Sequence, residues 1–441
     1  MTNPPTEGMV QEHEALLKIC HDFTQPECVD FFRTLPPDQA DDFFLRLSSQ
    51  DQYVLIKGLP PGERRIWLRL LPPDDVADLI QLANQEDREQ LMEQLDEATR
   101  REVAALLAYK EDAAGGLMNP RFARLRPDMT VDEAITYLRR QSGTVEAIYY
   151  AYVLDESQRL LGVVSFRDLF KADRNQKVRE IMRTDFIAAT EHMDQEAVAK
   201  LVSTYHLLAV PVVDGEGRMV GVVTLDDIVD VVEEEASEDI HKLGGMESLD
   251  APYLKIAFWS LVRKRAGWLA VLFIGEMLTA TAMSFFEQEI ARAVVLALFV
   301  PLIISSGGNS GSQATTLVIR AMAVGEIRLG DWFRIIRREL FAGLVLGSVL
   351  AAIGITRILL WQALWKPYGE HYVLVALTVA FSLIGVVMFG TIAGSMLPFI
   401  LRRLRLDPAS ASAPFVATLV DVTGLVIYFT IASIVLRGTL L

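Results

Sequence analysis

Five apolar segments in the second half of the chain are each long enough to cross a lipid bilayer. We expect spans near Ala266–Phe286, Ala291–Met322, Leu340–Trp361, Tyr372–Leu401 and Ala409–Leu436. The second and fourth exceed the usual twenty residues, so we expect them to tilt, break or project from the bilayer. The sequence therefore predicts a membrane-embedded bundle of five helices.

The last apolar segment contains a carboxylate, Asp421. A charged side chain in the middle of a bilayer costs roughly 2.5–3.5 kcal/mol on insertion scales, so an interaction must offset it. The usual interpretation of such an acid is an ion or proton site. The other acid that we place within the bilayer is Glu276, which either takes part in the same function or hydrogen-bonds within the bundle.

The second apolar segment is interrupted by the polar run Ser305–Gln313, which is rich in serine and glycine. A helix facing lipid does not expose so many polar groups, because hydrocarbon offers them no partner. Small residues also allow close packing between helices, which is the simpler explanation. The amides of Asn309 and Gln313 favour a water-filled path instead.

Basic residues predict the orientation of the spans. Eleven flank the spans on one side, at 263–265, 320–338 and 402–405, against three on the other, at 292, 366 and 437. This bias places the first side in the cytoplasm, so an odd number of spans leaves the C-terminus outside. Met1–Glu14 is polar and has no apolar core, so we expect no secretory signal. We expect a cell (inner) membrane protein with a cytoplasmic N-terminus.

The chain divides near residue 250 into halves of opposite charge. Of the 57 acidic and 42 basic residues, 9 and 16 follow residue 250, so the net charges are −22 before it and +7 after it. Such an acidic half repels nucleic acid and attracts cations. The simpler explanation is that its acids only confer solubility. Two cysteines, Cys20 and Cys28, are too few for a disulfide framework, and we expect inert thiols.

Two internal repeats organise the acidic half. The first joins Leu35-Pro-Pro-Asp, Leu59-Pro-Pro-Gly and Leu71-Pro-Pro-Asp, and Pro with Asp is typical of a helix N-terminus. We therefore expect a small superhelix of short helices over residues 1–112. The second repeat pairs Leu161-Gly-Val-Val-Ser-Phe-Arg-Asp-Leu169 with Val220-Gly-Val-Val-Thr-Leu-Asp-Asp-Ile228.

The second repeat resembles a tandem pair of CBS domains, which are β-α-β-β-α modules. The resemblance implies a cleft that binds an adenine nucleotide such as ATP. The residues that would line it are Ser165, Asp168, Thr224 and Asp227. Alternatively, each hydroxyl and carboxylate only caps the helix that follows. An acid-rich helix, Val229–Asp239, comes next, and a connecting helix over 241–265 is expected to join the soluble part to the membrane.

Together these features resemble the MgtE family of magnesium channels. The resemblance rests on the helical N domain, the CBS pair, the connecting segment, Ser306–Gln313 and the run Ala417-Thr-Leu-Val-Asp421-Val-Thr-Gly424. It implies a multidomain membrane protein with an all-α superhelical N domain, tandem α/β CBS domains and a transmembrane bundle of five spans. The expected domains are 1–112 (N), 113–240 (CBS pair), 241–265 (connecting, or plug, helix) and 266–441 (membrane).

The resemblance also implies a homodimer with a pore on its two-fold axis. Asp421 matches the family's pore aspartate and Ala417 a nearby backbone carbonyl, and we add Asn309 from the polar span. Some members carry Asn before the Pro of the last span, but here it is Ala413. Two carboxylates and carbonyls would hold a hydrated Mg²⁺, which loses its waters reluctantly. The sequence does not distinguish Mg²⁺ from Mn²⁺ or Co²⁺.

A cytosolic magnesium sensor is a further implication of the resemblance. Asp74 and Asp78 are four residues apart, so they share one helix face. Acids beyond the second CBS repeat should lie opposite, namely Asp226, Asp230, Glu235, Glu238, Asp239 and Asp250. High cytosolic Mg²⁺ would bridge these surfaces and close the pore.

Two rival functions remain open. One is a CBS-regulated, proton-coupled carrier of another divalent cation, which would use Asp421 or Glu276. The other is an intramembrane aspartyl protease, suggested by Asp421-Val-Thr-Gly424, which needs a second acid within catalytic reach.

Overall fold

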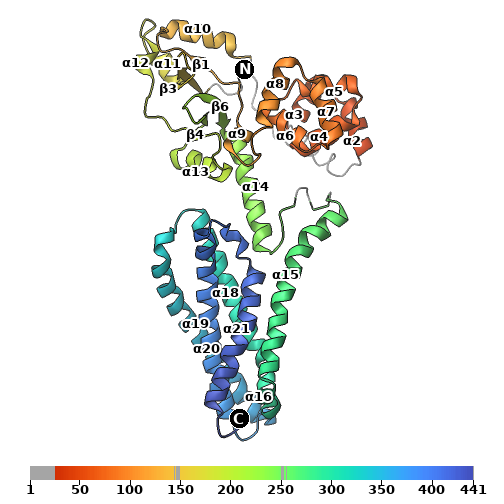
Figure 1. Ribbon diagram of the computed structural model, residues 1–441, viewed down its shortest axis with the longest axis vertical. Coiled ribbons are helices and arrows are strands. Elements are labelled where there is room, and N and C mark those ends of the chain that lie inside the picture. The colour runs from red at the N-terminus through yellow and green to blue at the C-terminus, as the bar shows by residue number, and fades with distance from the viewer. Residues whose placement is uncertain (1–24, 144, 146–148, 250–252, 255, 441) are drawn as a thin grey trace. The chain divides into compact units, whose positions relative to one another are not determined.

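The computed structural model describes residues 25–143, 145, 149–249, 253–254 and 256–440 (Figure 1). The chain divides into two compact units, Met1–Glu234 and Glu235–Leu441.

Short helices make up the first part of the N-terminal unit, and Pro opens three of them. The helices are α2 (Gln25–Thr34), α3 (Pro37–Leu45), α4 (Ser49–Gly58), α5 (Pro61–Leu68), α6 (Pro73–Gln81), α7 (Gln85–Gln94) and α8 (Glu97–Leu106). Because proline's fixed φ suits the first helical turn, each Leu-Pro-Pro phrase starts a helix. Phe44, Ile56 and Ile80 are fully buried in the shared core. The predicted all-α superhelix is confirmed.

The expectation of inert thiols is wrong at Cys28, which is disulfide-bonded. Cys20 lies outside the described residues.

Two similar α/β modules follow the helices. The first contains α9 (Ala114–Leu117), β1 (Arg124–Leu125), α10 (Val131–Gln141), β2 (Tyr150–Leu154), β3 (Leu160–Ser165) and α11 (Phe166–Lys171). The second contains α12 (Val178–Ile181), β4 (Ala189–Thr190), α13 (Gln195–Tyr205), β5 (Ala209–Val213), β6 (Met219–Thr224) and α14 (Leu225–Leu243). In each sheet a parallel pair precedes an antiparallel pair, in the orders β1-β2-β3 and β4-β5-β6. The predicted tandem CBS modules are confirmed.

The two modules exchange the segments that precede them. Asn119 forms a two-way backbone ladder with Val222 on β6, with N–O distances of 2.8 and 2.9 Å. Arg183 pairs in the same way with Val163 on β3, at 3.0 and 2.9 Å. Each module therefore depends on the other for the edge of its sheet.

The predicted helix over 241–265 is wrong in its extent. The helix α14 ends at Leu243, the described residues between Gly244 and Ala257 form no helix, and the next helix already begins at Phe258. Gly245 has φ +70° beside the Trp268 indole, and a left-handed residue ends a helix because it turns the chain. Arg263, Lys264 and Arg265 therefore belong to the first membrane helix.

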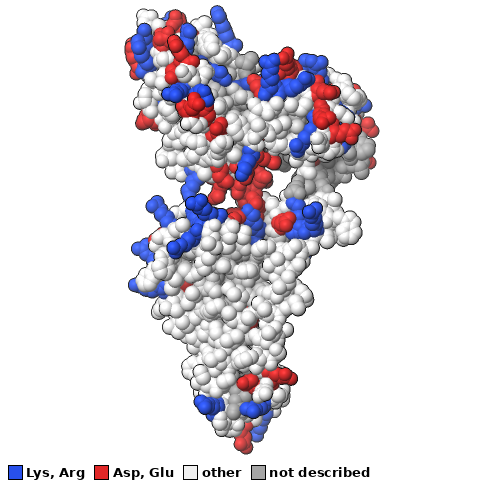
Figure 2. Space-filling model, in the orientation of Figure 1, with Lys and Arg blue, Asp and Glu red and all other residues white. Residues whose placement is uncertain are grey.

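The C-terminal unit is a helical bundle. It contains α15 (Phe258–Phe285), α16 (Glu287–Arg292), α17 (Val294–Ala297), α18 (Val300–Ala323), η1 (Leu329–Asp331), α19 (Trp332–Trp365), α20 (Tyr372–Arg403), η2 (Pro408–Ser410) and α21 (Ala413–Val435). Five helical segments within residues 258–435 are long and apolar enough to cross a membrane, which confirms the predicted five spans. The second expected span, Ala291–Met322, is divided into α17 and α18, and its first two residues belong to the end of α16. The face of the bundle in Figure 2 has few charges between two charged ends.

Glycines bring α18 and α20 into close backbone contact. A β-carbon at Gly311 would lie 2.8 Å from Val416 Cγ1 and 3.0 Å from the carbonyl oxygen of Gly390. Thr315 strengthens this contact, because its hydroxyl donates to the carbonyl of Gly394 at 2.8 Å. Small residues allow helices to approach this closely in a membrane. The glycine-rich span therefore has a structural role on its buried face.

Substitution of Gly311 by Ala should destabilise the bundle, whereas Gly308→Ala should not. The new methyl group at Gly311 overlaps Val416 and Gly390, and such overpacking typically costs about 1–3 kcal/mol. A β-carbon at Gly308 meets Ala417 at 3.6 Å, which is ordinary contact. Unfolding of the full chain in mixed detergent micelles with increasing SDS measures both variants. Equal stability of the two variants would contradict the close packing of α18 on α20.

Candidate functional site

Asp421 lies on the last membrane helix and is half-buried. The helix α21 starts after Ser412, whose hydroxyl accepts from the Phe415 backbone N–H at 3.3 Å, with Pro414 in the first turn. Ala417 and Asp421 are four residues apart and therefore share one face of α21. Gly308 of α18 lies against Ala417 on that face. The structure thus brings the polar span against the helix that contains the predicted pore aspartate.

Asn309 lies elsewhere on α18. Its side chain is exposed, and its amide donates to the Ser305 hydroxyl, one turn earlier, at 3.5 Å. Other residues of the polar span contact α21: Gly308 lies against Ala417, and the Ser312 hydroxyl donates to the carbonyl of Ala413 at 3.2 Å.

Glu276 on α15 is a close neighbour of Asp421. The two carboxyl groups lie within hydrogen-bonding range of each other. The helices approach closely here, because a β-carbon at Gly275 would lie 2.8 Å from Thr418 Cγ2. A further acid lies on a described membrane helix besides Asp421 and Glu276. The helix α19 begins eight residues before the predicted third span, so it also contains Glu339.

At the end of α14 in the C-terminal unit, an ion-pair network engages one of the predicted sensor acids. Lys242 Nζ lies 2.5 Å from Glu238 Oε1 and 2.6 Å from Asp407 Oδ2, next to the start of η2. Burial lowers the pKa of Lys242, but the hydrogen bonds to Asp407 and Glu238 outweigh burial and raise it. Glu235 and Asp239 are half-buried on the same helix, and Asp250 lies outside the described residues.

Within the N-terminal unit, acids of α6 lie near acids of α14. Burial, with the charges of Asp226 and Asp230, raises the pKa of Asp75 to about 6. Burial, with the charges of Asp75, Glu111, Asp227 and Glu234, raises the pKa of Asp78 to about 7. Of the predicted sensor acids, Asp226 and Asp230 therefore lie near α6, whereas Asp227 and Glu234 were not among those predicted. Asp75 was missed in the sequence, although its place in the first turn of α6 was visible.

The acids on the α14 side of this cluster also have raised pKa values. Burial raises the pKa of Asp227 to about 7 despite hydrogen bonds from Thr224. Burial, with the charges of Glu233 and Asp226, raises the pKa of Asp230. Acidic side chains gather over α14 in Figure 2. Deprotonation of these groups repels α6 from α14 unless a cation lies between them.

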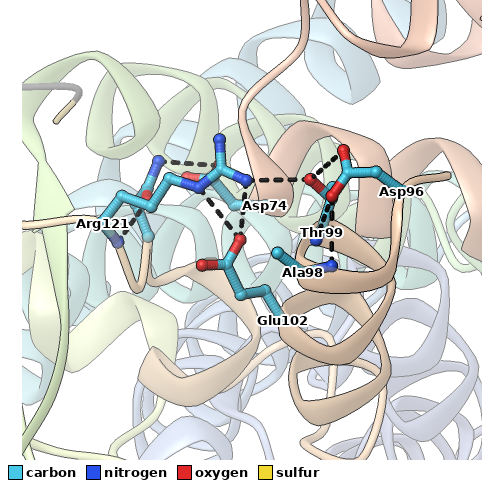
Figure 3. A network of polar contacts seen from close by, with 7 residues as sticks. Asp74, Asp96, Ala98, Thr99, Glu102 and Arg121 are labelled. Atoms are coloured by element: carbon cyan, nitrogen blue, oxygen red, sulfur yellow. Dashed lines mark hydrogen bonds and ion pairs between the residues drawn. The ribbon is translucent and has the colours of Figure 1, made fainter. Parts of the chain in front are cut away.

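Asp74 faces a different partner. It is only 4% exposed, and its Oδ1 accepts from the Asn119 amide at 3.1 Å. Figure 3 shows the network nearby, in which Arg121 donates to Glu102 at 2.7 Å and to Thr99 at 2.9 Å. This contact joins the helical N domain to the first CBS module, so the geometry assigns Asp74 a structural part.

No group of three or more His, Cys, Asp or Glu side chains within the described ranges is arranged to hold a metal ion directly. A hydrated Mg²⁺ does not need such a group, because it usually keeps several waters and binds through one or two carboxylates.

The predicted nucleotide residues form two local pairs. The Ser165 hydroxyl donates to Asp168 Oδ2 at 2.7 Å and also accepts from the Asp168 backbone N–H. Thr224 donates to Asp227 Oδ2 at 2.6 Å. Ser165 thereby caps α11, as the simpler alternative expects. In the second pair, Asp227 Oδ2 also accepts from the Thr224 backbone N–H at 2.9 Å.

Family models match most of the chain. The model described as a divalent cation transporter matches residues 300–431, the MgtE intracellular N domain matches 12–112, and CBS domains match 114–175 and 178–234. The magnesium transporter MgtE of Thermus thermophilus is 44% identical over 344 residues, which cover 78% of this chain and 74% of that protein. The chain belongs to the MgtE family. The MgtE protein of Enterococcus faecalis is 35% identical, over 76% of this chain and 72% of its own.

Among solved structures, one is the cytosolic domain of the Mg²⁺ channel MgtE in complex with ATP. It is 41% identical, covers 50% of this chain and 90% of its own, and has a TM-score of 0.47. The soluble part of a magnesium transporter is 28% identical over 52% of this chain, with a TM-score of 0.39.

The raised pKa values predict how the acidic cluster depends on pH. Asp75, Asp78 and Asp227 bind protons at higher pH when folded than when unfolded, where the pKa is about 3.9. Without divalent cations, the cluster should therefore gain stability as the pH falls from about 8 through 7 and 6. Hydrogen exchange of α6 and α14 in the full chain with EDTA, corrected for the intrinsic rate, measures this gain.

Asp78→Asn should increase protection at pH 8 and flatten the pH dependence, because it removes one repelling charge. Asp41→Asn on the exposed face of α3 is the matched control and should change neither. Protection that falls as the pH is lowered from 8 to 6 would contradict the assignment.

Proposed function

We propose that this MgtE-family protein passes Mg²⁺ into the cytoplasm through a homodimeric pore. The contact between the polar span and α21 at Gly308 and Ala417, one turn from Asp421, carries the proposal. A carboxylate held at this point in a membrane helix needs a compensating positive charge. Asp421 and Ala417 of both subunits would hold the hydrated ion, and the match to a divalent cation transporter model over 300–431 supports this use.

The proposed location is the cell (inner) membrane. The soluble N-terminal unit lies in the cytoplasm and the C-terminus outside, because most basic residues that flank the spans, at 263–265, 320–338 and 402–405, lie on the same side as the N-terminal unit.

Cytosolic Mg²⁺ closes this pore in our proposal. The acids of α6 and α14 repel when deprotonated, and a hydrated divalent cation between Asp75, Asp78 and the first turns of α14 would remove that repulsion. The ion stabilises the compact state because it binds that state better. Asp75 and Asp78 replace Asp74 and Asp78 as the α6 side of the sensor, because Asp74 is held by Asn119.

ATP binding to the CBS pair stays a prediction. The hydroxyls of Ser165 and Thr224 would need to exchange their present partners, Asp168 and Asp227, for a nucleotide. Proton-coupled transport of another divalent cation stays the alternative, because Asp421 has the second carboxylate of Glu276 beside it.

Asp421→Asn tests the pore. The substitution keeps the size of the side chain and removes one negative charge from each subunit, so Mg²⁺ flux into liposomes that contain the purified chain should fall at least tenfold. Asp331→Asn, in η1 at a helix end, is a charge-matched control and should retain flux. Unchanged Mg²⁺ flux through a correctly assembled Asp421→Asn protein would rule out the pore role.

The double variant Asp75→Asn, Asp78→Asn tests the sensor. Without these charges, Mg²⁺ has less repulsion to relieve, so inhibition of flux by Mg²⁺ on the side of the soluble unit should weaken. Flux at various Mg²⁺ concentrations on that side gives the half-inhibiting concentration. An unchanged value would show that α6 takes no part in inhibition, while the Asp421 result would be unaffected.

A further inference from the structure

Two polar residues of α15 lie near the proposed pore helix. Glu276 is exposed along the membrane segment of α15, and its carboxyl group is within hydrogen-bonding range of Asp421. The close approach of Gly275 to Thr418 fixes α15 against α21 at this level. A carboxylate on such a helix is costly in hydrocarbon, so its position beside Asp421 calls for a reason beyond packing.

Charge distinguishes the cations that this pair accepts. Two ionised carboxylates at close range repel strongly in a medium of low dielectric constant. One divalent cation neutralises both charges, whereas one monovalent cation leaves a net negative charge. The pair therefore favours a divalent ion over Na⁺ or K⁺.

A hydroxyl-bearing residue one turn from Glu276, Thr279, shares a face of α15 with Gly275, which meets α21, because Gly275 and Thr279 are four residues apart. The Thr279 Oγ1 atom is buried and has no hydrogen-bond partner. By contrast, Thr281 on the same helix donates to the carbonyl of Met277, four residues earlier, at 3.2 Å. A buried hydroxyl usually has a partner, and the waters that Mg²⁺ keeps are suitable ones.

We propose that Glu276 is a selectivity-determining residue of the ion path: with Asp421 it forms a paired-carboxylate site that binds a hydrated divalent cation in preference to a monovalent one. The inference rests on the proposed function, because it assigns a second carboxylate to the same path. Thr279 donates to or accepts from the waters of the bound ion.

The test compares Glu276→Gln with Glu339→Gln. Both remove one carboxylate from a membrane helix, but Glu339 lies on α19, whereas Glu276 is beside Asp421 on α21. Mg²⁺ and Na⁺ fluxes are measured in liposomes that contain each full-length variant. Glu276→Gln should lower the ratio of Mg²⁺ to Na⁺ flux by about tenfold, because one of the two charges is lost. Glu339→Gln should leave the ratio at the wild-type value.

Equal ratios in both variants would overturn the role of Glu276, and a fall in flux with Asp421→Asn would then leave the proposed pore intact. If Asp421→Asn also keeps full flux, the proposed function itself fails. Glu276→Asp keeps the charge on a shorter side chain and covers the case in which the Gln variant does not assemble. It should retain the flux ratio and raise the half-saturating Mg²⁺ concentration, and an unchanged concentration would contradict direct contact with the hydrated ion.

Discussion

Carboxylates held close together are the constraint on which this structure depends. In the N-terminal unit, acids of α6 lie near acids of α14, and burial raises the pKa of Asp78 and Asp227 to about 7. In the bundle, Asp421 lies beside Glu276. Each arrangement is unfavourable when ionised and becomes favourable when a cation is added. A hydrated divalent ion suits both places, because it carries two charges and tolerates ligands at a distance.

Close helix packing positions the membrane pair. Gly307 and Gly311 of α18 press against α20, while Gly308 on the same helix leaves ordinary contact with Ala417 of α21. The buried Tyr428 hydroxyl donates to the carbonyl of Leu296 at 2.8 Å and holds α21 to the broken start of the second span. The glycine-rich span therefore has two roles. One face packs closely against α20, and another contacts the proposed pore helix α21.

Local patterns predicted the elements well, and long-range contacts were harder to predict. Pro-Pro at 36, 60 and 72 marks helix starts because proline acts on its own turn. Whether Asp74 or Asp75 belongs to the proposed sensor depends on which side of α6 meets Asn119, a residue 45 positions away. The spacing of residues within α6 does not reveal that contact. Similarly, apolar composition located the third span but not its start, so Glu339 was left out. The Glu276–Asp421 pair joins the first and last spans. Hydropathy locates each span, but it does not show which residues of the two spans lie side by side.

The most direct test of the central claim compares Mg²⁺ with NaCl at equal ionic strength. Hydrogen exchange of α6 and α14 in the full chain is measured at pH 8 with each salt after removal of divalent cations. Salt screens exposed charges in general, whereas bridging requires a divalent ion between carboxylates of two surfaces. We predict that millimolar Mg²⁺ slows exchange in both helices and that NaCl does not. Equal protection by both salts would mean that the acids are only screened, and would contradict the claim that paired carboxylates in this protein are built to hold a divalent cation.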